Sequence, residues 1–361
     1  MPKMFDYLKW RGDLPFSQAP LNPVDALIFS SLCYTEFGEI VTDDPIRPGF
    51  FRDAVDHFFS LPDYEKRIRV KKDLELLLEA AESPRFRNVG LCFYRDEMIE
   101  EEESQFAAMT FLLDDGSAFL AYRGTDYTLV GWKEDFNMSF QDTVPAQRKA
   151  VEYLQEFAGV FSGPMYLGGH SKGGNLAVYA ASRCPEALQS RILAVYNNDG
   201  PGFTESLMGD PGYRAMVPKI HSYVPESSVV GLLLEHEEPC MIIKSRQVSI
   251  LQHDEYSWEV LGGDFVRVED ISGDSRFING TLHQWLAGKT RQERNAFVDA
   301  MFELLGTGEV SDARHIILPW NILNYIRTLT EDEQMRRTLT SALADLFRAA
   351  NSLRKRELPE K

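Results

Sequence analysis

Residues 164–181, PMYLGGHSKGGNLAVYAA, are the most informative stretch of this chain of 361 residues. An apolar run leads into the Gly-His-Ser-Lys-Gly motif of residues 169–173, and a run of good helix formers follows. A strand that turns sharply into a helix around a serine needs glycines two positions to either side. Larger side chains would collide there, where strand and helix cross. The pattern therefore predicts a nucleophile elbow with Ser171 at its tip.

Such an elbow has a chemical use. The serine hydroxyl stands exposed above the sheet, and the N–H groups at the start of the new helix face any oxygen that acquires negative charge. We therefore predict that Ser171 is the nucleophile of an acyl-transfer reaction. The alternative is a glycine-rich turn whose serine has no chemical role.

The segments on either side of the elbow predict an α/β fold. Before it, short β-rich runs at residues 89–94, 106–113 and 118–122, with an Asp-Asp-Gly turn at 114–116, indicate a meander and a hairpin. After residue 143, helices alternate with apolar strands, which is typical of a parallel sheet buried on both faces. We predict helices at 146–157 and 173–183 and strands at 165–167, 192–196, 219–224 and 241–243.

The chain ends suggest three parts. Residues 1–20 show no clear period and are expected to form an arm on the body of the protein. A helix should begin at Pro23 with Asn22 as its N-cap, and a second should lie within 63–82. From residue 291 onward, good helix formers dominate, notably in 294–305 and 331–353. The predicted division is an arm (1–20), a catalytic domain (21–290) and a helical C-terminal region (291–361).

Composition excludes several classes of partner. With 38 basic and 55 acidic residues, the net charge of −17 repels phosphate backbones, so nucleic acid is not an expected partner. The most apolar short run, Val229–Leu234, falls far short of the ~20 residues that span a bilayer. The first thirty residues lack the apolar core of a secretion signal. The four cysteines lie far apart in the sequence, so we expect them to be buried thiols and not disulfides. Free thiols are typical of a reducing compartment, and we therefore expect a cytoplasmic protein.

The run from Tyr122 to Thr125, Tyr-Arg-Gly-Thr, with Trp132 and Asp135 following, resembles class 3 lipases. The resemblance implies the α/β-hydrolase fold, a mostly parallel central sheet flanked by helices. It also assigns an oxyanion-hole donor to Thr125, and the second donor would be the backbone N–H of Lys172. The structural alternative for residues 123–125 is a strand end and turn in which Arg123 pairs with Asp135.

A closer resemblance is to the bacterial DUF2974 (Mbeg1-like) family of lipase-like proteins. It rests on the motifs within residues 6–13, 122–125, 169–177 and 198–203, and it covers residues 1 to about 260. Lys172 stands where class 3 lipases usually have leucine. This exchange should make the crevice more polar, which argues against a triglyceride substrate.

The general base must follow Ser171, because this fold orders its triad as nucleophile, acid and histidine. His253 follows a strand-like run, Val248–Leu251, and precedes a turn, so we predict that it is the base. The alternative is a surface histidine beside Asp254. The other candidates lie in a predicted strand, in an acidic run or in the helical C-terminal part: His221, His236, His283 and His315.

Two carboxylates compete for the role of triad acid. Asp199 ends the predicted strand 192–196 and opens a Gly-Pro-Gly loop, at the sheet edge where ligands bind in open α/β sheets. Glu226 follows the next strand, near where the resemblance to class 3 lipases would place an acid. Either could be structural, Asp199 as a turn or cap residue and Glu226 as a solvated charge. We prefer Asp199.

These assignments predict a serine hydrolase that cleaves a small-molecule acyl ester, lipid esters included, without metal or organic cofactor. A peptidase or a thioesterase would use the same groups. The rival from another class is a catalytically silent, hydrolase-like binding or scaffold protein. Its C-terminal helices would then serve a protein partner or self-association. The run 229–234 is expected to be a core helix or, alternatively, the lining or cover of an acyl pocket.

Overall fold

The computed structural model describes residues 1–99, 101, 104–125, 129–138, 141–306 and 333–357. Within them, an eight-stranded sheet runs from β1 to β8 in the order of the chain. Pairings from β1 to β4 are antiparallel, and those from β4 to β8 are parallel. The strands are β1 Gly49–Phe50, β2 Gly90–Ile99, β3 Ser104–Leu112, β4 Ala118–Tyr122, β5 Met165–His170, β6 Ile192–Asn198, β7 Ile220–Pro225 and β8 Cys240–Ile243.

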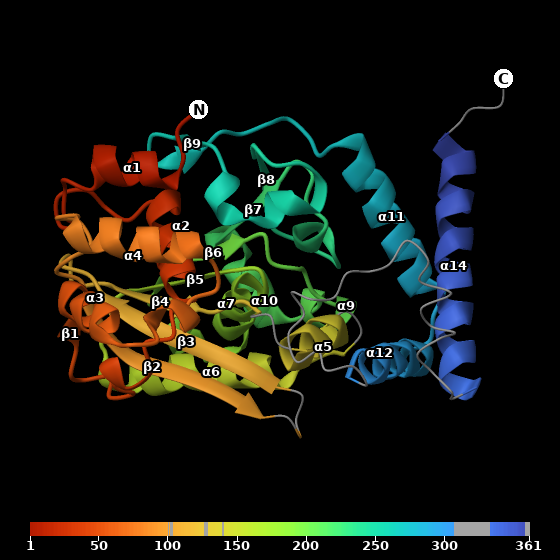
Figure 1. The fold of residues 1–361 in the computed structure, drawn as a ribbon, viewed down its shortest axis with the longest axis horizontal. Helices are drawn as coiled ribbons and strands as arrows, with labels where there is room; N and C mark the ends of the chain where they lie inside the picture. The colour runs from red at the N-terminus through yellow and green to blue at the C-terminus, as the bar shows by residue number, and fades with distance from the viewer. Residues whose placement is uncertain (100, 102–103, 126–128, 139–140, 307–332, 358–361) are drawn as a thin grey trace.

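Helices cover both faces of the sheet (Figure 1). Along β4, Phe119 and Ala121 enter one core while Leu120 and Tyr122 enter the other, because successive strand residues point to opposite faces. The first core is completed by α1 Met4–Arg11, α2 Pro23–Leu32, α3 Phe51–Ser60 and α4 Lys71–Glu82, and the second by α6 Pro145–Val160 and α7 Lys172–Arg183. This is the α/β-hydrolase fold, as predicted.

The helix at Pro23 is confirmed together with its cap. Asn22 accepts hydrogen bonds from the N–H groups of Val24 and Asp25 at 3.0 and 3.2 Å, and Pro23 occupies the first turn. The alternation after residue 143 is also confirmed, since α6, β5, α7, β6, β7 and β8 all overlap their predicted ranges. Short helices fill the connections: α5 Leu129–Met138, α8 Glu186–Gln189, α9 Glu205–Met208 and α10 Pro211–Met216.

Residues 1–20, expected to form an arm on the body of the protein, contain α1, whose buried face includes Tyr7 and Leu8. Two local expectations of secondary structure are wrong. No strand forms at Val248–Leu251. Residues Ser249–His253 form a 3₁₀ turn instead, and both apolar ends of the run, Val248 and Leu251, are exposed. The apolar residues of this run are therefore not explained by burial within a sheet. The run 229–234 forms only a 3₁₀ turn, Val230–Leu232, so the core helix expected there does not form.

From residue 291 onward the described residues are helical, as predicted: they form α12 Arg291–Gly306 and α14 Glu333–Glu357. A further helix, α11 Gly273–Ala287, and a small hairpin of β9 Val260–Leu261 and β10 Asp264–Phe265 precede them. Trp285 Nε1 donates to the carbonyl of Ala342 at 3.1 Å, which joins α11 to α14. Figure 1 shows α12 and α14 at the end of the molecule opposite α1 and α3. None of the helices in the described ranges is both long and apolar enough to cross a membrane.

Candidate active site

Ser171 is the single residue between the end of β5 and the start of α7. Its backbone has φ +59° and ψ −133°, a conformation that residues other than glycine rarely adopt. The Ser171 N–H donates to the carbonyl of Asn198 on the neighbouring strand at 2.9 Å, which anchors the turn to β6. Such strain persists only where the surroundings enforce it, and it clusters at functional sites.

The glycines flanking Ser171 are required by the crossing of strand and helix, as predicted from the motif. A Cβ on Gly169 would lie 2.2 Å from the backbone carbon of Gly173. A Cβ on Gly173 would lie 2.0 Å from the carbonyl oxygen of Tyr122. These clashes are with backbone atoms that cannot rotate away, so the elbow admits no larger residue at either position.

His253 and Asp199 are brought together from segments 54 residues apart. His253 Nδ1 lies 2.6 Å from Asp199 Oδ2. The Asp199 carboxylate is fully buried, whereas the imidazole is 27% exposed. Since a carboxylate only accepts, Nδ1 carries the proton in a neutral imidazole, and the lone pair is on Nε2. Asp199 comes directly after β6, which ends at Asn198, the residue whose carbonyl anchors Ser171.

The second oxygen of Asp199 is held by the loop after β7. Ser228 Oγ donates to Asp199 Oδ1 at 2.6 Å, and the N–H of Gly231 lies 3.2 Å from the same oxygen. A Cβ on Gly231 would come within 2.2 Å of that oxygen. Nothing in the sequence indicated either contact, although Ser228, which is buried, directly precedes the apolar run 229–234.

Glu226, the alternative acid, lies elsewhere in this loop. Its backbone N–H donates to the carbonyl of Ile243 at 2.9 Å, and its carbonyl accepts from the N–H of Ser272 at 2.6 Å. Among the described residues, its carboxylate makes no hydrogen bond or ion pair with His253. The geometry therefore favours Asp199 as the partner of His253.

Thr125 follows β4 and faces α5. Its Oγ1 lies 2.6 Å from both carboxylate oxygens of Asp135, to one of which the hydroxyl donates. Arg123 instead forms a two-pronged contact with Asp96, at 2.7 Å for each nitrogen, so the expected pairing of Arg123 with Asp135 is wrong. Burial raises the pKa of Asp135 to about 6, although the charge of Lys172 and the Thr125 hydrogen bond oppose the shift.

Lys172 turns its side chain into the protein. Its Nζ lies 2.9 Å from Glu134 Oε2 and 3.0 Å from the carbonyl of Gln105, and both charged groups are buried. The ammonium is therefore paired inside the fold, not open to the crevice as the sequence suggested. As the first residue of α7, Lys172 also has a backbone N–H without an intrahelical acceptor, which suits an oxyanion-hole donor.

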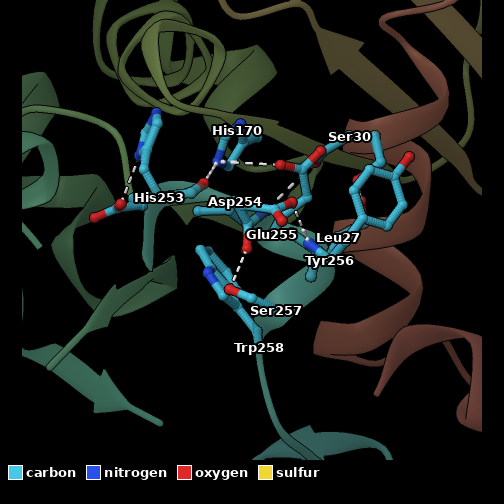
Figure 2. Close-up of polar contacts among 12 residues, drawn as sticks. Leu27, Ser30, His170, His253, Asp254, Glu255, Tyr256, Ser257 and Trp258 are labelled. Carbon is cyan, nitrogen blue, oxygen red and sulfur yellow. Dashed lines mark hydrogen bonds and ion pairs between the residues drawn. The ribbon is translucent and has the colours of Figure 1, made fainter. Parts of the chain in front are cut away.

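His170 supports the loop that carries His253, as Figure 2 shows. His170 Nε2 lies 2.9 Å from the carbonyl of His253, which can only accept, so Nε2 carries the proton. The other nitrogen, Nδ1, then accepts from the Tyr34 hydroxyl at 3.1 Å. Burial lowers the pKa of His170 to about 3, which keeps the ring neutral. The motif contained His170, but nothing in the sequence indicated its partners.

The other histidines have different partners. His221, in β7, stacks on Tyr196 with ring centroids 5.3 Å apart. His236 Nδ1 lies 3.0 Å from Glu238 Oε1, and His283 Nδ1 lies 3.8 Å from Glu235 Oε1. The candidate His315 lies outside the described residues. Within the described chain, His253 is thus the histidine whose ring contacts Asp199.

Comparisons with solved structures return lipases at low similarity. A structure titled M37 lipase has 13% identity and a TM-score of 0.36, and the match covers 58% of this chain and 68% of that one. A lipase–propeptide complex from Rhizomucor miehei has 17% identity and a TM-score of 0.34, covering 49% and 70%. A mutant form of MDLA from Penicillium cyclopium has 13% identity and a TM-score of 0.40, covering 69% and 87%.

Two further comparisons concern sequence. No curated protein matches this chain. The profile of the Mbeg1-like family matches residues 80–303, which is more than half of the chain and includes the elbow and the His253–Asp199 pair. The chain therefore belongs to the Mbeg1-like family.

Proposed function

We propose that this protein is a serine hydrolase that cleaves an acyl ester through an acyl-enzyme on Ser171. The observation that carries the proposal is the 2.6 Å contact between His253 Nδ1 and the buried carboxylate of Asp199, beside a strained elbow. A carboxylate in this position orients the imidazole and stabilises the imidazolium that forms when serine is deprotonated.

The proposed reaction has two halves. His253 Nε2 takes the proton from Ser171 Oγ as the oxygen attacks the ester carbonyl, and the resulting oxyanion accepts hydrogen bonds from the N–H groups of Thr125 and Lys172. The tetrahedral intermediate collapses, and the C–O bond to the alcohol breaks as His253 returns the proton to the leaving oxygen. Water, deprotonated by His253, then releases the acid and restores Ser171.

The acyl-ester substrate follows from the resemblance of Tyr122–Thr125 to class 3 lipases, and lipid esters fall within this class. We also infer a cytoplasmic location. All four cysteines are free thiols, and three of them are buried, as suits a reducing compartment. The division into an arm, a catalytic domain and a C-terminal helical region remains part of this proposal, as does a role of the C-terminal helices in binding a protein partner.

A fluorophosphonate probe separates an enzyme from a silent, hydrolase-like scaffold. We expect the probe to label the wild type and Ser190→Ala, an exposed serine that serves as the matched control. Ser171→Ala should be neither labelled nor active on a short p-nitrophenyl ester, while its circular dichroism is unchanged. A folded wild type that is neither labelled nor active would overturn the proposal in favour of the scaffold.

A further inference from the structure

The three residues that follow His253 are each held by one short segment before and within α4. The guanidinium of Arg69 forms an ion pair with Glu255. Lys72 Nζ lies 2.9 Å from Asp254 Oδ2, and the Tyr256 hydroxyl donates to Asp73 Oδ1 at 2.6 Å. We call Arg69, Lys72 and Asp73 the N-terminal clamp. Its contacts bridge more than 180 residues of sequence.

Two of the clamp contacts are buried. The side chains of Glu255 and Asp73 are each 1% exposed, and that of Arg69 is 13% exposed. Burial is the largest single effect on Glu255 and opposes its ionisation, but the charge and hydrogen bond of Arg69, together with smaller contributions that include His170, lower the pKa of Glu255 to about 2. The Lys72–Asp254 pair is 44% and 34% exposed, so it contributes little. The clamp therefore acts mainly through Arg69 and Asp73.

Asp73 also stabilises the start of α4, the segment from which it contacts Tyr256. Its second oxygen, Oδ2, accepts from the N–H groups of Arg69 and Val70 at 3.0 and 2.8 Å, which caps the start of α4. Arg69 in turn lies over the ring of Tyr34, with the guanidinium carbon 3.8 Å from the ring centroid. One rigid helix end thus holds the loop that carries the candidate base.

His253 needs such external support, because its own segment is a 3₁₀ turn in which Leu251 is exposed, as is Val248 just before it. Runs of 3₁₀ helix have poor hydrogen-bond geometry and little stability of their own. Figure 2 shows the loop from His253 to Trp258 with its polar contacts to His170, and the side chains of His170 and Glu255 are each 1% exposed. His170 Nε2 is 3.7 Å from Glu255 Oε2, so the clamped carboxylate also lies beside the histidine that holds the His253 carbonyl.

We propose that Arg69 and Asp73 are positioning residues for His253, acting through Glu255 and Tyr256. The inference rests on the proposed hydrolase function. It also makes the segment before residue 80, which lies outside the residues matched by the family profile, a part of the active unit. A displacement of the imidazole by about 1 Å is enough to lower turnover by about 100-fold.

The chain offers a matched control, since a second Tyr–Asp–Arg group lies in the same core. The Tyr7 hydroxyl donates to Asp25 Oδ1 at 2.8 Å, and Asp25 pairs with Arg85 at 2.6 Å with both charges fully buried. In the described structure, no hydrogen bond or ion pair joins Tyr7, Asp25 or Arg85 to the loop of residues 253–258. Tyr7→Phe and Arg85→Met therefore report the loss of a buried contact without displacement of His253.

Tyr256→Phe should lower kcat on a short ester by about 10-fold, and Arg69→Met should lower it by about 100-fold. KM should not change in either variant, and both kcat values are corrected for the folded fraction. The controls, Tyr7→Phe and Arg85→Met, should lose stability but keep the wild-type kcat. If Arg69→Met does not fold, the kcat of Tyr256→Phe tests the proposal. Wild-type kcat in folded Tyr256→Phe, or equal loss of kcat in Tyr7→Phe, would overturn the proposal.

A second readout does not depend on turnover. The proton between His253 Nδ1 and Asp199 should give a low-field proton NMR signal, assigned by its loss in His253→Gln. It should persist in Tyr7→Phe and broaden or shift in Tyr256→Phe. If the wild type does not react with a fluorophosphonate but the signal responds in this way, the proposed function fails and the positioning role stands. If the wild type is active but the NMR signal does not change in Tyr256→Phe, the positioning role is wrong and the proposed function is unaffected.

Discussion

Ser228, just after the end of β7, donates a 2.6 Å hydrogen bond to Asp199, just after the end of β6. The bond occupies the carboxylate oxygen that does not face His253, so two adjacent strand ends share the task of holding the candidate acid. A short carboxylate fixed at both oxygens cannot rotate away from the imidazole. This arrangement explains how an aspartate at φ +55° keeps one orientation.

The first prediction tests Asp199 against Glu226. Asp199→Asn should lower kcat by a factor on the order of 10⁴, because an amide favours the wrong imidazole tautomer and does not stabilise the imidazolium. Glu226→Gln should change kcat by less than about twofold, since its carboxylate has no contact with His253. Kinetics on one ester, with circular dichroism for folding, decide the matter. A near-normal Asp199→Asn beside an inactive Glu226→Gln would reverse the assignment.

The second prediction concerns Ser228. Ser228→Ala removes a hydrogen bond to a charged group, an interaction that contributes about 1.5–3 kcal/mol. We expect kcat to fall by about 10-fold while KM is unchanged, because Asp199 remains but is less firmly oriented. Ser227→Ala is the matched control, since its hydroxyl contacts Ser272 Oγ at 3.1 Å and not Asp199. Equal kinetics for the two variants would show that the Ser228 bond does not orient the acid.

The third prediction concerns the buried Lys172–Glu134 pair. Lys172→Met leaves Glu134 buried without its cation, which should cost about 3–5 kcal/mol in the free energy of unfolding. The double variant Lys172→Met/Glu134→Gln should recover much of the loss, because it leaves no uncompensated charge.

Urea unfolding measures both Lys172 variants. As a control, Lys149→Met breaks the more exposed Lys149–Glu97 pair and should cost about 1 kcal/mol or less. A single Lys172 variant as stable as wild type would contradict the idea that this pair matters to the fold.

The fourth prediction concerns the pH dependence of stability through Asp135. Burial raises the pKa of this carboxyl in the folded protein to about 6, from about 3.8 when it is solvated. The folded state therefore binds the proton more tightly, so this contribution is fully present below pH ~4 and is lost as the pH rises through ~6. Relative to Asp135→Asn, the wild type should lose up to about 2–3 kcal/mol between pH 4 and 7.

Urea titrations of both proteins across this pH range check the sign, since the groups common to both cancel in the difference. A difference in unfolding free energy that stays constant, or that grows in favour of the wild type with rising pH, would contradict the burial of Asp135 as the cause.

The sequence predicted those parts of the site that local sterics determine. The crossing of strand and helix around Ser171 excludes any side chain at residues 169 and 173, so the elbow could be inferred from the five residues 169–173. The pairing of His253 with Asp199 was preferred from chain order and strand ends, and the structure brings the two side chains together. Their catalytic roles remain predictions.

What the sequence could not show is contact between distant segments. Arg123 had an acidic candidate nearby in Asp135, yet it pairs with Asp96, because β2 and β3 bring that residue to the end of β4. The clamp residue Arg69 meets Glu255 only once the N-terminal helices have packed on the sheet. Local pattern also failed at Val248–Leu251, where apolar residues lie exposed and not in a strand.

The sequential order of the strands has a consequence for how the protein is made. Because β4 to β8 lie side by side in chain order, each new strand can add to an edge that already exists, and a growing sheet never waits for a distant partner. This strand order allows Ser171 and Asp199 to reach their strand ends before residue 253 has been synthesised. The last polar group to arrive is the imidazole of His253, and Arg69 and Asp73, among the earliest residues synthesised, receive the residues that follow it.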